Sequence, residues 1–251
     1  IYGSRGANGV VLFTTKKGKT GKTEFTITTN SGVSEVAHMI KTLDTPAYLN
    51  MLQTALDNNG DTASNFSNGI ALTDWDPNAY TNWQKKLIGG TANFNNYSAS
   101  LKGGNETTNF LLSGAYHKET TVVPGDFSYD KFSTNFNINH STLDRKLKVG
   151  ASVIFATDNN KLPFFDITTY AVGTAPNRPL YNADGSYYWS PDYFSDINPL
   201  ASLEKRVDDK GINLITSFNL QYEIAKGFSF KTDLGYGRAQ MQTKQFMPAA
   251  A

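Results

Sequence analysis

Polar and apolar residues alternate with a period of two along much of the chain, which is the pattern of a strand that buries one face. In the segment 132–139, every second residue from Phe132 to Ile138 is Phe, Thr or Ile, and the residues between them are Ser and Asn. A strand with a wholly polar second face has that face in water. The same reading predicts strands over seven segments: 24–33, 96–102, 109–117, 132–139, 147–156, 212–223 and 228–237.

The connections between these strands alternate between short and long. Short connections fall at 103–108, 140–146 and 225–227, and long ones at 34–95, 118–128 and 157–211. Strands of about ten residues can cross a bilayer at a tilt, and outer-membrane barrels have tight turns on the periplasmic side and long loops outside. The pattern therefore predicts an all-β protein, a transmembrane antiparallel β-barrel with long extracellular loops.

The first long loop contains a predicted helix. Thr45 is a good N-cap, Pro46 suits the first helical position, and apolar residues then recur at helical spacing until Gly60, which can end the helix. We expect one amphipathic helix over 46–58, packed on the extracellular mouth.

Aromatic residues gather in the first and third long loops. Flat rings can stack on the apolar face of a sugar or bury against a partner protein, although an interfacial girdle and loop packing would use the same residues. A turn signal at 182–186 predicts a hairpin beside them. The candidate ligand- or partner-binding residues are Trp75, Tyr80, Trp83, Tyr187, Tyr188 and Trp189.

Composition removes several classes of protein. No apolar stretch is long enough for a membrane helix, and an aromatic content of 13% argues against disorder. A net charge of +1 gives no broad attraction for nucleic acid, and the absence of cysteine excludes disulfides, thiolate zinc sites and cysteine nucleophiles.

No pattern of catalytic or metal-binding residues emerges either. His38, His117 and His140 stand far apart, and neither a phosphate-binding loop nor a nucleophile elbow is present. The segment 57–61 imitates the start of a calcium loop, but Thr62 replaces the required glycine. We therefore expect no enzymatic activity, no metal and no cofactor.

The N-terminal segment carries a specific motif. The run YGSRGANGVV, followed by TTKKG, resembles the end of the plug domain in TonB-dependent outer-membrane transporters of the SusC/RagA branch of Bacteroidota. Segments 97–104, 108–116 and 198–200 also resemble that branch. Glycines spaced by three permit tight turns before a short strand over 10–15. The motif residues are Tyr2, Gly3, Arg5, Gly6, Asn8 and Gly9.

The resemblance implies a barrel of about 22 strands around an N-terminal plug. Seven strands cannot close a barrel, since the smallest has about eight, so the rest of the barrel, most of the plug and the TonB-contacting segment are expected outside this sequence. We divide the chain into the end of the plug domain (1–18), a linker (19–23) and the N-terminal part of the barrel (24–251).

The function implied by the resemblance is TonB-dependent import of oligosaccharides or peptides across the bacterial outer membrane. Such proteins work with a SusD-like surface lipoprotein, contact TonB and face outer-membrane lipid. Two alternatives remain open: a SusC-like barrel that serves as a structural subunit beside other subunits of a larger outer-membrane complex, and a soluble β-rich carbohydrate-binding or hydrolytic domain.

Overall fold

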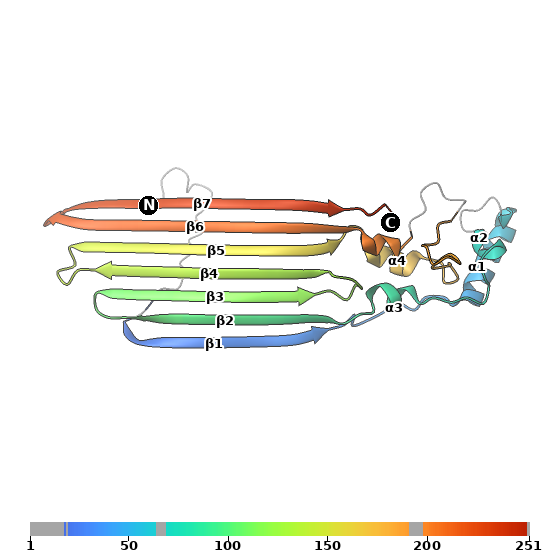
Figure 1. Ribbon diagram of the computed structural model, residues 1–251, viewed down its shortest axis with the longest axis horizontal. Coiled ribbons are helices and arrows are strands. Elements are labelled where there is room, and N and C mark those ends of the chain that lie inside the picture. Colours follow the sequence, from blue (N-terminus) through green and yellow to red (C-terminus); the bar gives the residue numbers. More distant parts are fainter. Residues whose placement is uncertain (1–17, 19, 64–68, 191–197, 250–251) are drawn as a thin grey trace.

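The computed structural model describes residues 18, 20–63, 69–190 and 198–249. In this part of the chain, seven strands form one antiparallel sheet in which each strand pairs with its sequence neighbours (Figure 1). The strands are β1 (Gly21–Ser34), β2 (Ala92–Gly104), β3 (Thr108–Thr120), β4 (Ser128–Ser141), β5 (Leu147–Pro163), β6 (Arg206–Ala225) and β7 (Phe228–Phe246). All seven segments predicted as strands are strands.

The helices lie in the connections. They are α1 (Thr45–Asn59), α2 (Ile70–Thr73), α3 (Trp83–Ile88), α4 (Ile167–Gly173) and the 3-10 helix η3 (Ala201–Glu204). No helix within the described ranges is long and apolar enough to cross a membrane.

The sheet has one apolar and one polar face, because residues opposite each other in neighbouring strands point to the same side. Leu112 lies opposite Phe136, which lies opposite Val153. We call this side the apolar face. Its large side chains are between 38% and 64% exposed and include Phe25, Ile27, Tyr97, Leu112, Tyr116, Phe132, Ile212, Phe218, Phe230, Leu234 and Tyr236.

The opposite side, which we call the polar face, carries mainly Ser, Thr, Asn and small residues. Asn139 donates from Nδ2 to the Oδ1 atoms of Asn137, at 2.7 Å, and Asn109, at 3.2 Å. Asn137 is only 7% exposed. The alternation over 132–139 is thus confirmed as an alternation between two faces of one sheet.

The strands are longer than predicted, with 13 to 20 residues each. The ladder continues into stretches where both faces are polar: Lys210 lies opposite Asn159, which lies opposite Asp130. Alternation of polar and apolar residues marks a strand that buries one face. The backbone hydrogen bonds of a sheet form between polar residues as well. The long connections shrink accordingly to 35–91, 121–127 and 164–205, and all lie at one end of the sheet, with the tight turns at the other (Figure 1).

The predicted helix is present as α1, but the N-cap prediction was wrong. Asp44 is the cap, and its Oδ1 accepts a hydrogen bond from the backbone N–H of Ala47 at 3.0 Å. Thr45 is already helical, and its hydroxyl instead donates to the carbonyl oxygen of Ala79 at 2.6 Å. Gly60 ends the helix in the left-handed region at φ 69°, as predicted.

Candidate partner and ligand interface

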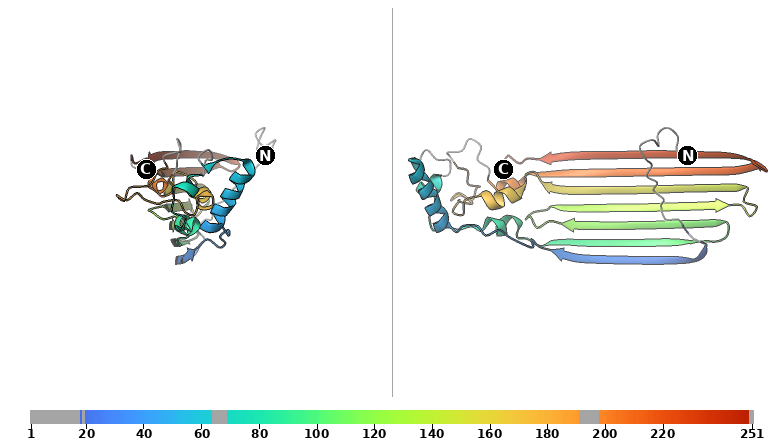
Figure 2. Two further views of the ribbon diagram at one scale, coloured as in Figure 1. Left: turned by 90° about the vertical axis from the view of Figure 1, so that its right-hand side faces the viewer. Right: turned by 180° about the vertical axis from the view of Figure 1, so that it is seen from behind.

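The two long connections 35–91 and 164–205 fold together beyond one end of the sheet, and we call their described residues the loop layer (Figures 1 and 2). One hydrophobic cluster joins α3 to α4: Trp83 and Leu87 pack with Ile167, Ala171 and Leu200. Each loop alone would leave its half of this cluster in water. The two loops therefore stabilise one another.

A second cluster forms around α1 and α2. Leu52, Ile70, Ala71 and Trp75 are buried there, and Ala175 and Tyr188 from the other loop pack against them. Asn177 is 1% exposed and donates from Nδ2 to the carbonyl oxygen of Ala71 at 2.9 Å. The loop layer is thus cross-linked by both apolar and polar contacts between its two loops.

Three of the six candidate rings belong to this packing. Trp83 is 4% exposed, and its Nε1 donates to the carbonyl oxygen of Ala175 at 2.9 Å. The Nε1 of Trp75 donates to the hydroxyl of Tyr188 at 2.9 Å, with the rings edge to face at 6.2 Å. These rings connect the two loops.

Tyr187 is half-buried beside the predicted hairpin. Its hydroxyl donates to Oε1 of Glu204 at 2.9 Å, and its ring stacks on Tyr181 with a centroid distance of 5.8 Å. Burial and the neighbouring Glu204 carboxylate raise the pKa of Tyr187 to about 12. The hairpin is confirmed by the pairing of Tyr181 with Tyr187 and by Gly185 at φ 84°.

Tyr80 and Trp189 are the candidate rings with the largest exposed fractions, 53% and 41%. Large exposed rings can anchor a partner at little cost in side-chain entropy. Of the six candidates, these two present the most ring surface to solvent.

A pocket of about 350 Å³ adds residues that the sequence did not single out. Tyr181 and Tyr187 form one wall, while Asp126, Glu204 and Arg206 supply charge. A hydrogen bond from Lys161 lowers the pKa of Asp126. An aromatic wall beside carboxylates and a guanidinium suits a ligand rich in hydroxyl groups or amides. The sequence indicated this region through the turn signal at 182–186 and the candidate Tyr187, but not through the charged residues.

Among the described residues, no group of three or more His, Asp or Glu side chains is arranged to hold a metal ion. His117 lies on the polar face, with Nδ1 2.6 Å from Oδ1 of Asn96 and Nε2 3.4 Å from Oε2 of Glu119. His140 contacts the hydroxyl of Thr108. The contacts with Asn96 and Thr108 connect neighbouring strands.

Comparison with protein-family models finds no match. Among curated proteins, TonB-dependent receptor P3 of Formosa agariphila is 28% identical over 99% of this chain, which spans 24% of that receptor. TonB-dependent receptor SusC of Bacteroides thetaiotaomicron is 28% identical over 79% of this chain and is covered to 18%. The chain therefore spans about a quarter or less of these relatives.

Solved structures agree with the sequence relatives. The RagAB peptide importer in its open-open state matches with a TM-score of 0.72 at 19% identity, over 98% of this chain and 31% of that chain. Its closed-closed state gives a TM-score of 0.69. The resemblance to SusC/RagA-type TonB-dependent receptors is confirmed. The fold class expected from the sequence, an antiparallel sheet of the transmembrane barrel type, is confirmed with it.

The receptor-like features fall on different parts of the chain. The plug motif, from Tyr2 to Gly9, lies outside the described residues, and the division at 18 and 23 stays a prediction. The segment 198–200 has a structural role, because Asn198 accepts from the N–H of Leu200 at 2.8 Å and donates to the carbonyl oxygen of Tyr188 at 2.7 Å. This segment therefore helps to fix the loop layer.

Proposed function

We propose that this chain is part of a TonB-dependent outer-membrane importer for oligosaccharides or peptides that works with a SusD-like surface lipoprotein. The loop layer forms the extracellular mouth, and the sheet forms part of the membrane wall. In transport, this chain binds and guides the substrate and makes or breaks no covalent bond.

The observation that carries this proposal is the agreement of a sequence likeness and a fold likeness over almost the whole chain. The sequence aligns with a TonB-dependent receptor over 99% of its length, and the fold aligns with a peptide importer over 98%. The exposed apolar face fits the same proposal, because a large unpartnered apolar surface is unfavourable in water. This face weighs against the soluble carbohydrate-binding alternative.

The substrate class rests on the chemistry of the loop layer. The pocket beside Tyr181 and Tyr187 offers ring faces and charged groups, which serve sugars and peptides alike. The exposed rings of Tyr80 and Trp189 are the proposed anchors for the lipoprotein.

Transport is tested in the native host with strains that lack either this protein or TonB. Uptake of fluorescent oligosaccharides and peptides is measured in each strain. We expect one of the two substrate classes to be lost from both strains. Unchanged uptake of both classes in the strain without this protein would overturn the proposal. Loss of other subunits from the outer membrane, without loss of uptake, would favour the structural alternative.

The partner is tested by purifying the tagged complete protein. A Tyr80→Ala/Trp189→Ala variant should bind the lipoprotein about 30-fold more weakly or worse and so recover less of it, since anchoring rings contribute more than about 1 kcal/mol each. The matched control is Tyr80→Phe/Trp189→Phe, which keeps a large ring at both positions. Equal recovery of the lipoprotein with both variants would show that these rings are not part of the interface.

A further inference from the structure

The apolar face becomes basic near the long-loop end of the sheet. Beyond the register row that contains Tyr97, Tyr116 and Phe132, the next row contains Lys118 and Lys210. The rows after it contain Lys161, Lys244 and Arg206. On the edge strand β7, the change to polar residues comes earlier, at Arg238, as expected of strands that are tilted in a membrane. We call these residues the basic belt: Lys118, Lys161, Arg206, Lys210, Arg238 and Lys244.

The carboxylates near the basic belt neutralise only part of it. Lys118 pairs with Asp130 at 3.7 Å, Lys161 with Asp126, and Arg206 with Asp208 at 3.3 Å. Within the described residues, no ion pair engages Lys210 or Lys244. Lys244 lies opposite Asp208 in the register, but the ion pair of that carboxylate is with Arg206. Two exposed lysines therefore carry uncompensated charge.

Lys210 and Lys244 are close enough to share one anion. Lys210 lies opposite Gln242, so Lys244 is its diagonal neighbour on β7. Diagonal neighbours have Cβ atoms roughly 7–8 Å apart, a spacing that two long ammonium side chains can bridge around a single phosphate group.

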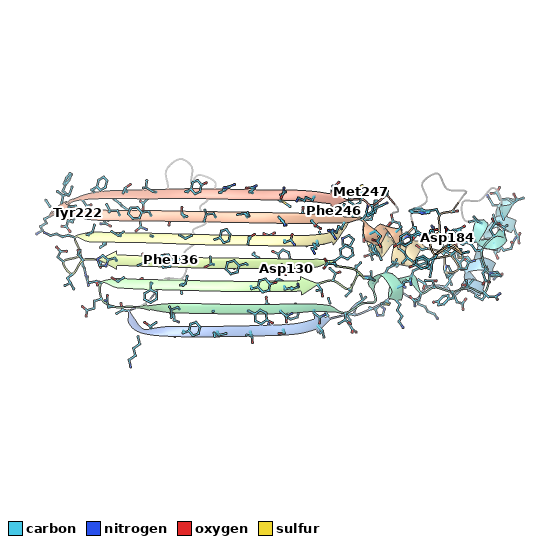
Figure 3. The ribbon with its side chains drawn as sticks, viewed as in Figure 1. Asp130, Phe136, Asp184, Tyr222, Phe246 and Met247 are labelled. Atoms are coloured by element: carbon cyan, nitrogen blue, oxygen red, sulfur yellow. The ribbon has the colours of Figure 1, made fainter. Side chains whose placement is uncertain are left out.

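The polar face carries the opposite charge at the same height. Glu119, Asp158 and Asp209 lie in the corresponding rows there, with Lys131 as the cation on those strands. The sorting of charge is therefore specific to the face. Figure 3 shows where this level lies: Asp130 and Phe246 sit toward the long-loop end of the sheet, and Tyr222 sits at the turn end.

We propose that the basic belt binds the phosphate groups of anionic lipids in the leaflet on the long-loop side, with Lys210 and Lys244 as its anchors. Lipid is the occupant because the belt continues the exposed apolar face without a break, so acyl chains on that face place their headgroups at the belt. This inference rests on the proposed membrane location and adds a lipid partner to it.

The experiment uses the complete protein purified in detergent and measures its affinity for lipid A, a glycolipid with two phosphates, in mixed micelles. A Lys210→Gln/Lys244→Gln variant should bind lipid A about 25-fold more weakly at low salt, because each basic residue near an anionic surface contributes about five-fold. The wild-type affinity should also fall as salt is raised, since exposed charges are screened.

The matched control removes two lysines from one row of the polar face, with Lys148→Gln/Lys231→Gln, and should leave the affinity unchanged. Lys210→Arg/Lys244→Arg keeps the charge and should retain binding, which separates charge from folding if the Gln variant assembles poorly. Equal loss in the control, or undiminished binding in the Gln variant, would overturn the proposal.

Three further outcomes show which of the two proposals fails. Inorganic phosphate that displaces lipid A at comparable concentration would show a free-anion site and overturn the lipid assignment. If the Lys210→Gln/Lys244→Gln variant loses lipid A binding but keeps substrate uptake, the basic belt is supported and the proposed transport function is unaffected. Intact lipid binding in a protein that transports nothing would instead count against the proposed function alone.

Discussion

The sheet and the loop layer are held together by different means. The sheet is a continuous backbone ladder between strands that follow one another in the sequence. Among the described residues, only Ala92 and Leu111 are buried hydrophobic residues within strands; the others lie in the connections. The loop layer instead has clusters built from residues far apart in sequence, such as Trp83 with Ala171. One region needs an apolar surrounding, whereas the other packs as a small water-soluble domain does.

Removing a ring from the loop layer should give the largest effect. Trp83→Ala opens a cavity at the centre of the cluster that joins α3 to α4, and such truncations cost about 3–5 kcal/mol. We expect rapid protease cleavage of the two loops while the sheet stays intact. Tyr80→Ala is the control, because that ring is exposed. Equal protease resistance of Trp83→Ala and wild type would show that the two loops do not depend on this cluster.

A charge on the apolar face should damage the sheet somewhat less. Phe136→Arg near the middle of the membrane should cost about 2–4 kcal/mol in denaturant unfolding from a bilayer. Asn135→Arg on the polar face is the matched control; Asn137, buried and hydrogen-bonded, is less suitable. Similar costs at Phe136 and Asn135 would contradict the assignment of the faces.

A helix cap should matter least among these substitutions. Asp44→Ala removes the acceptor for the N–H of Ala47 and should cost the loop layer about 1 kcal/mol. Asn58→Ala, at an exposed position near the other end of α1, should have little effect. Hydrogen exchange of the first turn of α1 measures both, and identical exchange in the two variants would reject the cap.

Tyr187 provides a test by pH. Its pKa is raised to about 12, so the folded protein holds the phenol proton more tightly than the unfolded chain does. The resulting stabilisation is fully present below the ordinary pKa of about 10 and is lost as pH rises toward 12. Tyr187→Phe should therefore flatten the decline in loop-layer stability between pH 10 and 12. A slope unchanged by the substitution would show that burial and the contact with Glu204 do not raise the pKa of Tyr187.

Local patterns were enough to predict the sheet. Period-two alternation identified every strand of the described sheet, because burial on one face makes adjacent residues alternate between apolar and polar. The ends of the strands were not predicted, because the residues that pair there, such as Lys210 and Asn159, are polar and show no alternation. The family resemblance rested on a motif that lies outside the described residues.

The loop layer was harder to predict for a physical reason. The aromatic residues were recognised, but exposure separates Tyr80 and Trp189 from the buried Trp75 and Trp83, and exposure depends on contacts across more than a hundred positions, such as that between Trp75 and Tyr188. Asp44 replaced Thr45 as the cap because Thr45 found a distant acceptor in Ala79. Contacts of this range leave no periodic signal.

The central claim is that the sheet is a membrane wall with lipid on its apolar face. The chain has no cysteine, so single cysteines can be placed at each position from 132 to 139 in the complete protein and spin-labelled in bilayers. We predict that oxygen accessibility, which reports lipid, is high at Phe132, Phe136 and Ile138. Accessibility to a water-soluble nickel complex should peak at Ser133, Asn135 and Asn139 on the polar face. Equal accessibility of both faces to the nickel complex, with no period of two, would contradict the account.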